Sequence, residues 1–285
     1  MARRLKFLTG LSTLAVAGTL ALVGCTGKGE GEGATAAAKG APAGAGGEGK
    51  GEGAAAAPAP ILPAGGEGEG GVDFAAAAND PVVFRSALAI AEAHVIAARD
   101  AYAAGRKEEA AAMFAHPVGE VLADMEGAFA ARGVPSMNEL FVDASAGVIA
   151  DETTEQINTR TAAILAALRA AAEKAPADAR SPAAISGGVI SDQIDRAADM
   201  YRLAGASGDY GHYLDGYGFY KAAEGAYARG RTVIETGNPA LAAQIAAALT
   251  ALGAVYPSAE APAAINGDVA ALSAASSRVM LALGR

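Results

Sequence analysis

The residues of this chain best suited to chemistry are its three histidines, because imidazole binds borderline metal ions. His94 and His116 lie at equal distances along the chain from Gly105, one on each side. If Gly105 forms the turn between two antiparallel helices, the two imidazoles come level with each other. Glu120 and Asp124 follow His116 at intervals of about one helical turn. We therefore expect His94, His116, Glu120 and Asp124 to form a metal site inside a helical bundle.

The same residues have a second interpretation. Pro117 directly follows His116, and a proline inside a helix removes a hydrogen bond and bends the helix, unless it starts a new one. The two histidines can be ordinary residues with local hydrogen-bond partners, and the acidic residues after them can be a solvated helix face. Both interpretations stay open from the sequence.

A second candidate cluster lies further along the chain. Residues 209–220 contain four of the eight tyrosines together with Asp209, His212 and Asp215. Carboxylate, phenolate and imidazole groups suit an ion such as iron. The frequent glycines predict an irregular loop over residues 205–218, and loops often carry function. The alternative is a structural segment whose tyrosines cover the end of a bundle and bond to backbone groups.

The composition excludes several other kinds of function. The 285-residue chain has a formal net charge of -9, which argues against a nucleic-acid partner. Its single cysteine excludes an intramolecular disulfide and a multi-cysteine metal site. The sequence contains no zinc-protease helix motif, no nucleophile elbow, no phosphate loop and no dinucleotide fingerprint. We therefore predict that the protein is not an enzyme. A metal-dependent hydrolase is the third choice, after a metal-binding protein and a helical adaptor.

The N-terminal residues resemble a secretion signal. Three basic residues precede an apolar run over residues 11–23, which is too short to cross a bilayer core of about 30 Å. The following Leu22-Val23-Gly24-Cys25 resembles a bacterial lipobox. This resemblance implies that residues 1–24 are a signal peptide and that Cys25 carries palmitate and other acyl chains in a lipid bilayer. Thr26 stands where an inner-membrane retention signal has Asp, which in a Gram-negative bacterium favours the periplasmic face of the outer membrane.

The rest of the chain divides into a tether and a body. Residues 25–71 are mostly Gly, Ala, Glu, Lys and Pro, which predicts a disordered tether. Residues 72–285 are rich in alanine, poor in aromatic residues and show no alternation at period two, which predicts an all-α bundle of about seven to eight helices. We expect helices over 79–105, 106–132, 137–149, 152–174, 189–203, 219–236, 238–256 and 268–283. The break over 175–188 leaves open a division into two smaller bundles.

The order of these features resembles a known group of proteins. An N-terminal hairpin carries His94 and the stretch Phe114-Ala115-His116-Pro117-Val118-Gly119-Glu120. Tyr201, residues 209–219 and a final helix with Ser276-Ser277-Arg278 follow. This order resembles helical periplasmic proteins of bacterial iron uptake, namely imelysin-like proteins and the periplasmic region of Ftr-type iron permeases. The resemblance implies an envelope lipoprotein that binds a metal ion, most simply iron, or passes it to an envelope protein partner.

A second resemblance leads to a different function. Tyr102, Gly105, Ala110 and Phe114 lie close to the spacing of a tetratricopeptide repeat, although the 34-residue period characteristic of that repeat is not sustained. The alternative is therefore a non-enzymatic helical adaptor that binds a protein in a groove.

Overall fold

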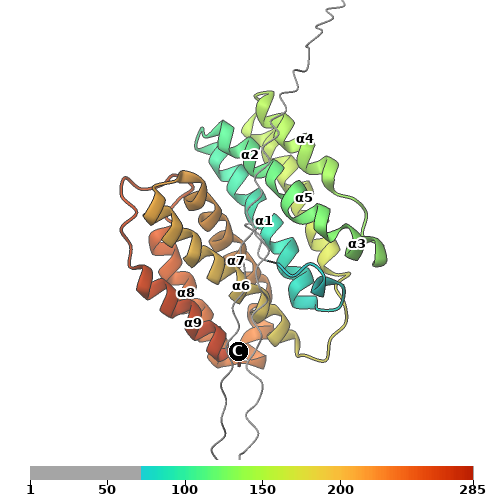
Figure 1. The fold of residues 1–285 in the computed structure, drawn as a ribbon, viewed down its shortest axis with the longest axis vertical. Helices are drawn as coiled ribbons and strands as arrows, with labels where there is room; N and C mark the ends of the chain where they lie inside the picture. Colours follow the sequence, from blue (N-terminus) through green and yellow to red (C-terminus); the bar gives the residue numbers. More distant parts are fainter. Residues whose placement is uncertain (1–71, 285) are drawn as a thin grey trace, which may run out of the picture. The chain divides into compact units, whose positions relative to one another are not determined.

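The computed structural model describes residues 72–284, and this part of the chain is the predicted all-α bundle, without a strand (Figure 1). The helices in chain order are η1 (Ala76–Ala78), α1 (Pro81–Ala103), α2 (Lys107–Pro117), η2 (Val118–Leu122), α3 (Ala123–Ala131), α4 (Asn138–Ile149), α5 (Thr154–Ala172), α6 (Pro182–Ser207), α7 (Tyr210–Gly237), α8 (Pro239–Val255) and α9 (Val269–Ala282). The predicted signal peptide, Cys25 and the tether lie outside the described residues.

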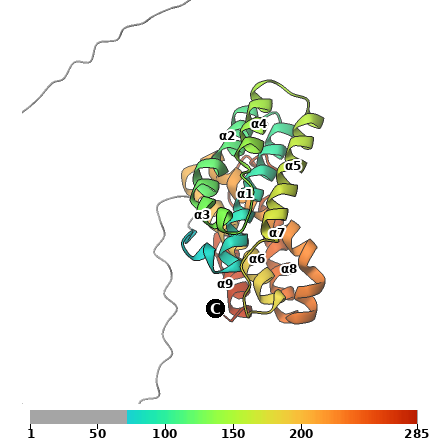
Figure 2. The same cartoon turned by 90° about the vertical axis from the view of Figure 1, so that its right-hand side faces the viewer.

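Helix α1 is the central element of the bundle. It packs against α2 and α5 on one side and against α6 and α7 on the other. Figure 1 shows α2 to α5 on one side of α1 and α6 to α9 on the other, and Figure 2 shows the same bundle turned by 90°. The helix begins where the sequence predicts, since Asp80 accepts hydrogen bonds from the N–H groups of Val82 and Val83 and Pro81 occupies the first turn. The break over 175–188 therefore separates helices that share α1 as a neighbour.

Helix α1 is also long and apolar enough to cross a membrane, alone among the helices of residues 72–284. Of its most apolar stretch, however, 83% is buried inside the bundle. A core helix of a folded domain passes the same test of length and composition, and burial explains the apolar sequence of α1.

Helices α2, η2 and α3 form one continuous helix with an irregular turn in its middle. Pro117 lacks an N–H group and closes α2, and the chain then continues through a π-helical turn over Val118–Leu122. Counted as one helix, these three elements bring the described α-helices to eight, within the predicted range. The predicted helix over residues 106–132 is confirmed, and its π turn is a feature that the sequence pattern does not reveal.

The predicted loop over residues 205–218 is wrong. Only Gly208 and Asp209 separate α6 from α7. Gly208 adopts the left-handed conformation at φ 72°, and the carboxylate of Asp209 accepts a hydrogen bond from the N–H of Gly211 at 2.7 Å. The break before α6 is also shorter than expected, because α6 already begins at Pro182 with Ser181 as its cap.

Two glycines that favoured the loop prediction serve close packing inside α7. A side chain at Gly218 would meet the carbonyl oxygen of Ala93 on α1 at 2.6 Å. A side chain at Gly216 would overlap the hydroxyl group of Tyr256. Glycine lets backbones approach this closely, and a propensity argument misreads such residues as helix breakers.

Candidate metal centre

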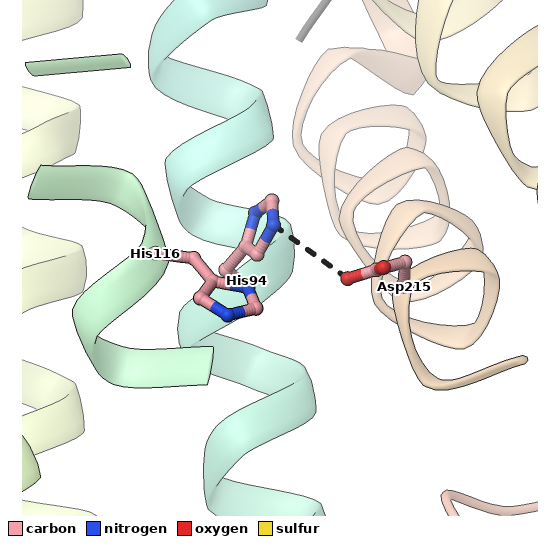
Figure 3. A group of neighbouring side chains, drawn as sticks. All are labelled: His94, His116 and Asp215. Atoms are coloured by element: carbon pink, nitrogen blue, oxygen red, sulfur yellow. Dashed lines mark ion pairs between the residues drawn. The ribbon is translucent and has the colours of Figure 1, made fainter. Parts of the chain in front are cut away.

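The structure brings His94, His116 and Asp215 together between α1, α2 and α7 (Figure 3). One potential ligand atom from each residue lies within 4.8 Å of the others. Among the described residues, these three form the single group of three or more potential metal ligands. The expected pairing of His94 with His116 across the hairpin is present, with ring centroids 5.9 Å apart.

His94 is held in a fixed orientation by α1. Its Nδ1 lies 2.9 Å from the carbonyl oxygen of Ile90, one helical turn earlier. A carbonyl oxygen only accepts, so Nδ1 carries a hydrogen and Nε2 faces the site. Nε2 lies 3.6 Å from Oδ1 of Asp215 and 3.8 Å from Oε2 of Glu120. A backbone carbonyl on one imidazole nitrogen is the usual support for a histidine that binds metal through the other.

His116 contributes the second imidazole, from the last turn of α2. Its Nδ1 is buried and has no hydrogen-bond partner within residues 72–284. A buried polar atom without a partner costs about 1–3 kcal/mol and calls for an explanation such as a bound ion or water. This atom is therefore a place in the group where an added ligand would find a free polar partner.

Asp215 supplies the carboxylate, and its position follows from the packing of α7. It lies three residues before Gly218, so the two residues share the face of α7 that contacts α1. The close approach at Gly218 and Ala93 then carries Asp215 to His94. The side chains of His94 and Asp215 are only 4% and 7% exposed, and Phe219 meets the His94 ring edge to face at 5.9 Å. The centre is therefore largely sealed from solvent on the α7 side.

Glu120 lies at the edge of the centre, on the π turn, and its side chain is 33% exposed. A π-helical turn contains more residues than an α-helical turn and is frequent at functional sites. The same turn changes the register between residues 116 and 124, so the α-helical spacing that placed Asp124 beside the site does not hold. Asp124 is exposed and is not part of the group.

The second predicted cluster, Asp209, His212 and Asp215, is not brought together by the structure. Asp209 caps α7, and the Nδ1 of His212 lies 3.2 Å from the hydroxyl oxygen of Ser207. Because residues 210–237 are helical, side chains at positions 209 and 215 point in different directions. Asp215 joins the hairpin histidines instead. The sequence signal for the position of Asp215 is the glycine at position 218, about one helical turn later. That signal can be recognised only once the packing of α7 on α1 is known.

Two of the four tyrosines of residues 210–220 bond to backbone groups, as the alternative interpretation expects. Tyr210 and Tyr213 donate hydrogen bonds to the carbonyl oxygens of Ala259 and Ser258, both at 2.9 Å. Burial and the neighbouring Asp100 carboxylate raise the pKa of Tyr217 above its usual range, and Tyr217 donates a hydrogen bond to Asp100 at 2.8 Å. Burial therefore keeps these phenols protonated in the ordinary pH range.

The donor atoms fit a borderline divalent ion. Two imidazoles and one carboxylate match both histidine and carboxylate zinc sites and the two-histidine, one-carboxylate iron(II) sites. Ligands at about 2.1 Å from one ion are at most about 4.2 Å apart, and the 3.6 Å between Nε2 of His94 and Oδ1 of Asp215 meets that condition. The ligand atoms of the whole group lie within 4.8 Å of one another, which is close to the same condition.

Comparison of the chain with protein-family models, with curated proteins and with solved structures finds no match.

Proposed function

We propose that the helical body binds one metal ion, iron(II) in the simplest case, through His94, His116 and Asp215, with Glu120 beside them. The observation that carries this proposal is the meeting of two imidazoles and a buried carboxylate from three helices. The buried Nδ1 of His116, which has no hydrogen-bond partner within residues 72–284, supports it. Buried polar groups are normally satisfied, and a metal ion would satisfy this one.

Iron(II) is the first choice because two histidines and one carboxylate leave coordination positions for further ligands. The bound ion would supply a Lewis-acidic centre with positions for exchange. The protein's own part is to orient the ligands: Ile90 fixes the ring of His94, and the packing of α7 on α1 holds Asp215. Glu120 is partly exposed, so its carboxylate offers an approaching cation a first contact before the buried ligands.

The proposal also includes the location of the protein. The basic residues, apolar run and Leu22-Val23-Gly24-Cys25 support an envelope lipoprotein held to the outer membrane by acylated Cys25. We propose that such a protein, similar to imelysin-like and Ftr-associated iron-uptake proteins, binds iron near the membrane and passes it to a protein partner without catalysing a reaction.

The test is metal content. The purified full-length chain is loaded with iron(II) without oxygen, dialysed exhaustively and analysed by inductively coupled plasma mass spectrometry, with zinc and manganese in parallel. We expect about one equivalent of retained iron in the parent protein, and loss of that iron in His116→Ala and Asp215→Asn. His212→Ala and Asp124→Asn are matched controls outside the group and should retain it.

Two results would overturn the metal proposal. One is a parent protein that retains no iron, zinc or manganese. The other is retention in His116→Ala and Asp215→Asn equal to that of the parent. Circular dichroism of each variant shows that the helical fold is intact, so a loss of metal is assigned to the site. A failed metal proposal would leave the helical adaptor as the function to test.

A further inference from the structure

A cavity of about 370 Å³ lies between α1, α5, α6 and α7. Its volume is in the range of about 300–1,000 Å³ that is typical of small-molecule sites. On α1 it is lined by Arg85, Leu88, Ala89 and Glu92. Glu92 and His94 are two residues apart on one helix, so their side chains point to nearly opposite sides. The cavity is therefore separate from the metal centre.

A buried carboxylate at the cavity is shared by two arginines. The side chain of Glu92 is only 7% exposed, and its Oε1 lies 2.8 Å from a guanidinium nitrogen of Arg169 and 3.2 Å from one of Arg229. A second nitrogen of Arg229 lies 3.3 Å from Oε2. The two arginine side chains are 47% and 43% exposed, so they stand where the cavity meets solvent. One negative charge here faces two positive charges.

A third guanidinium group, that of Arg85, adds to this positive excess. Its Nε is buried and has no hydrogen-bond partner, and Arg85 forms no ion pair within the described part of the chain. Of the acidic residues, Glu92 and the exposed Glu173 line the cavity, against three arginines. This excess stands out because the whole chain has 31 acidic and 22 basic residues.

We propose that this cavity binds a small organic anion that carries one carboxylate and an apolar tail. The guanidinium of Arg85 is the group to receive the carboxylate, because a planar fork of N–H donors matches its two oxygens. The tail lies against the apolar wall of Leu88, Leu168, Val189 and Ile190. An apolar wall beside a guanidinium that has a partnerless Nε and forms no ion pair within the described residues favours such a ligand over inorganic phosphate, which has no apolar part.

Hexanoate is a suitable probe, with 1-hexanol and inorganic phosphate as comparisons. We expect isothermal titration calorimetry of the full-length chain to show saturable hexanoate binding, with 1-hexanol and phosphate each at least about tenfold weaker. Absence of saturable hexanoate binding would overturn the proposal. Equal binding of 1-hexanol would overturn it as well, because the carboxylate would then contribute nothing.

Three substitutions assign the binding to this cavity. Arg85→Met keeps an apolar stem but removes the charge, and should weaken hexanoate binding by about tenfold or more. Glu173→Gln removes an exposed negative charge at the cavity and should strengthen binding by about twofold. Arg278→Met, an exposed arginine outside the cavity, is the matched control and should change nothing. Wild-type affinity in Arg85→Met, or weaker binding in Glu173→Gln, would refute the assignment.

Discussion

Gly218→Ala tests the claim that the close approach of α7 to α1 holds the metal centre together. The added Cβ would lie 2.6 Å from the carbonyl oxygen of Ala93, 3.0 Å from its carbonyl carbon and 3.1 Å from the Cβ of Ala97. Ordinary contact begins near 3.4 Å, so the two helices would have to separate by about 0.8 Å at this point. The atoms in the way belong mainly to backbone, which cannot rotate aside as a side chain can.

The cost follows from two opposing terms. Overpacking of a closely packed contact costs about 1–3 kcal/mol, and the backbone contact places this case at the upper end. Alanine has a higher helix propensity than glycine, by up to about 1 kcal/mol. We therefore expect a net loss of about 2 kcal/mol in the free energy of unfolding. Asp215 lies on the same helix face, so its displacement from His94 should also weaken metal binding.

Gly230→Ala is the matched control on the same helix. Its Cβ would meet Ile234 at 3.5 Å and Ser186 at 3.7 Å, both ordinary contacts, so only the propensity term applies. We expect it to be as stable as the parent protein or more stable, by up to about 1 kcal/mol. Urea unfolding followed by circular dichroism measures both variants. A Gly218→Ala protein as stable as the parent, or a Gly230→Ala protein that loses as much, would refute the packing argument.

Two further substitutions test other parts of the bundle. Asp80→Ala removes the cap of α1 and the pair with Arg180 at 2.7 Å, and should cost about 1–2 kcal/mol near neutral pH. Partial burial raises the pKa of Asp80, but hydrogen bonds from Arg180 and from the first turn of α1 outweigh it and lower the pKa overall. The stabilisation by Asp80 is therefore present above the usual carboxyl pKa and is lost as the pH falls through the lowered pKa. The urea unfolding midpoints of the parent protein and the variant should converge at acid pH, and a difference between the midpoints that stays constant with pH would contradict this. Tyr256→Phe removes the hydrogen bond to the carbonyl oxygen of Ala197 at 2.8 Å and should cost about 1 kcal/mol. Burial also raises the pKa of Tyr256, so the stabilisation by Tyr256 is lost as the pH rises above the usual tyrosine pKa. The difference in stability between the parent protein and Tyr256→Phe should therefore shrink at alkaline pH, and a difference that stays the same would contradict this.

Helix ends were the most predictable part of the fold, because their signals are local. Asp80 followed by Pro81, Asn238 followed by Pro239, and Asp268 each begin a helix where the sequence predicts one. A capping side chain needs only neighbouring N–H groups, so three or four residues suffice to recognise it.

The start of helix α7 was predicted as a loop because its glycines are needed for contacts with residues far along the chain. Gly216 makes room for Tyr256, and Gly218 makes room for the backbone of Ala93. Nothing within a few residues distinguishes such a glycine from a loop glycine. Only the tertiary packing of α7, against α1 at Gly218 and against Tyr256 at Gly216, explains why glycine occupies these positions.

The candidate site divides in the same way. The pairing of His94 with His116 was predictable, since a tight hairpin at Gly105 fixes which residues face each other. Asp215 was assigned to the wrong cluster because it reaches His94 only through tertiary packing. The expected place of Asp124 failed because the π turn after Pro117 shifts the helical register.

X-ray absorption at the iron K edge tests the metal centre most directly, because it reports the ligands of the bound ion themselves. For the iron-loaded full-length chain we expect a first shell of nitrogen and oxygen at about 2.0–2.2 Å, with the outer-shell scattering of about two imidazoles. His116→Ala, at whatever iron occupancy it reaches, should show the imidazole contribution reduced by about half. Bound iron without imidazole scattering, or scattering unchanged in His116→Ala, would contradict the assignment of His94, His116 and Asp215 as its ligands.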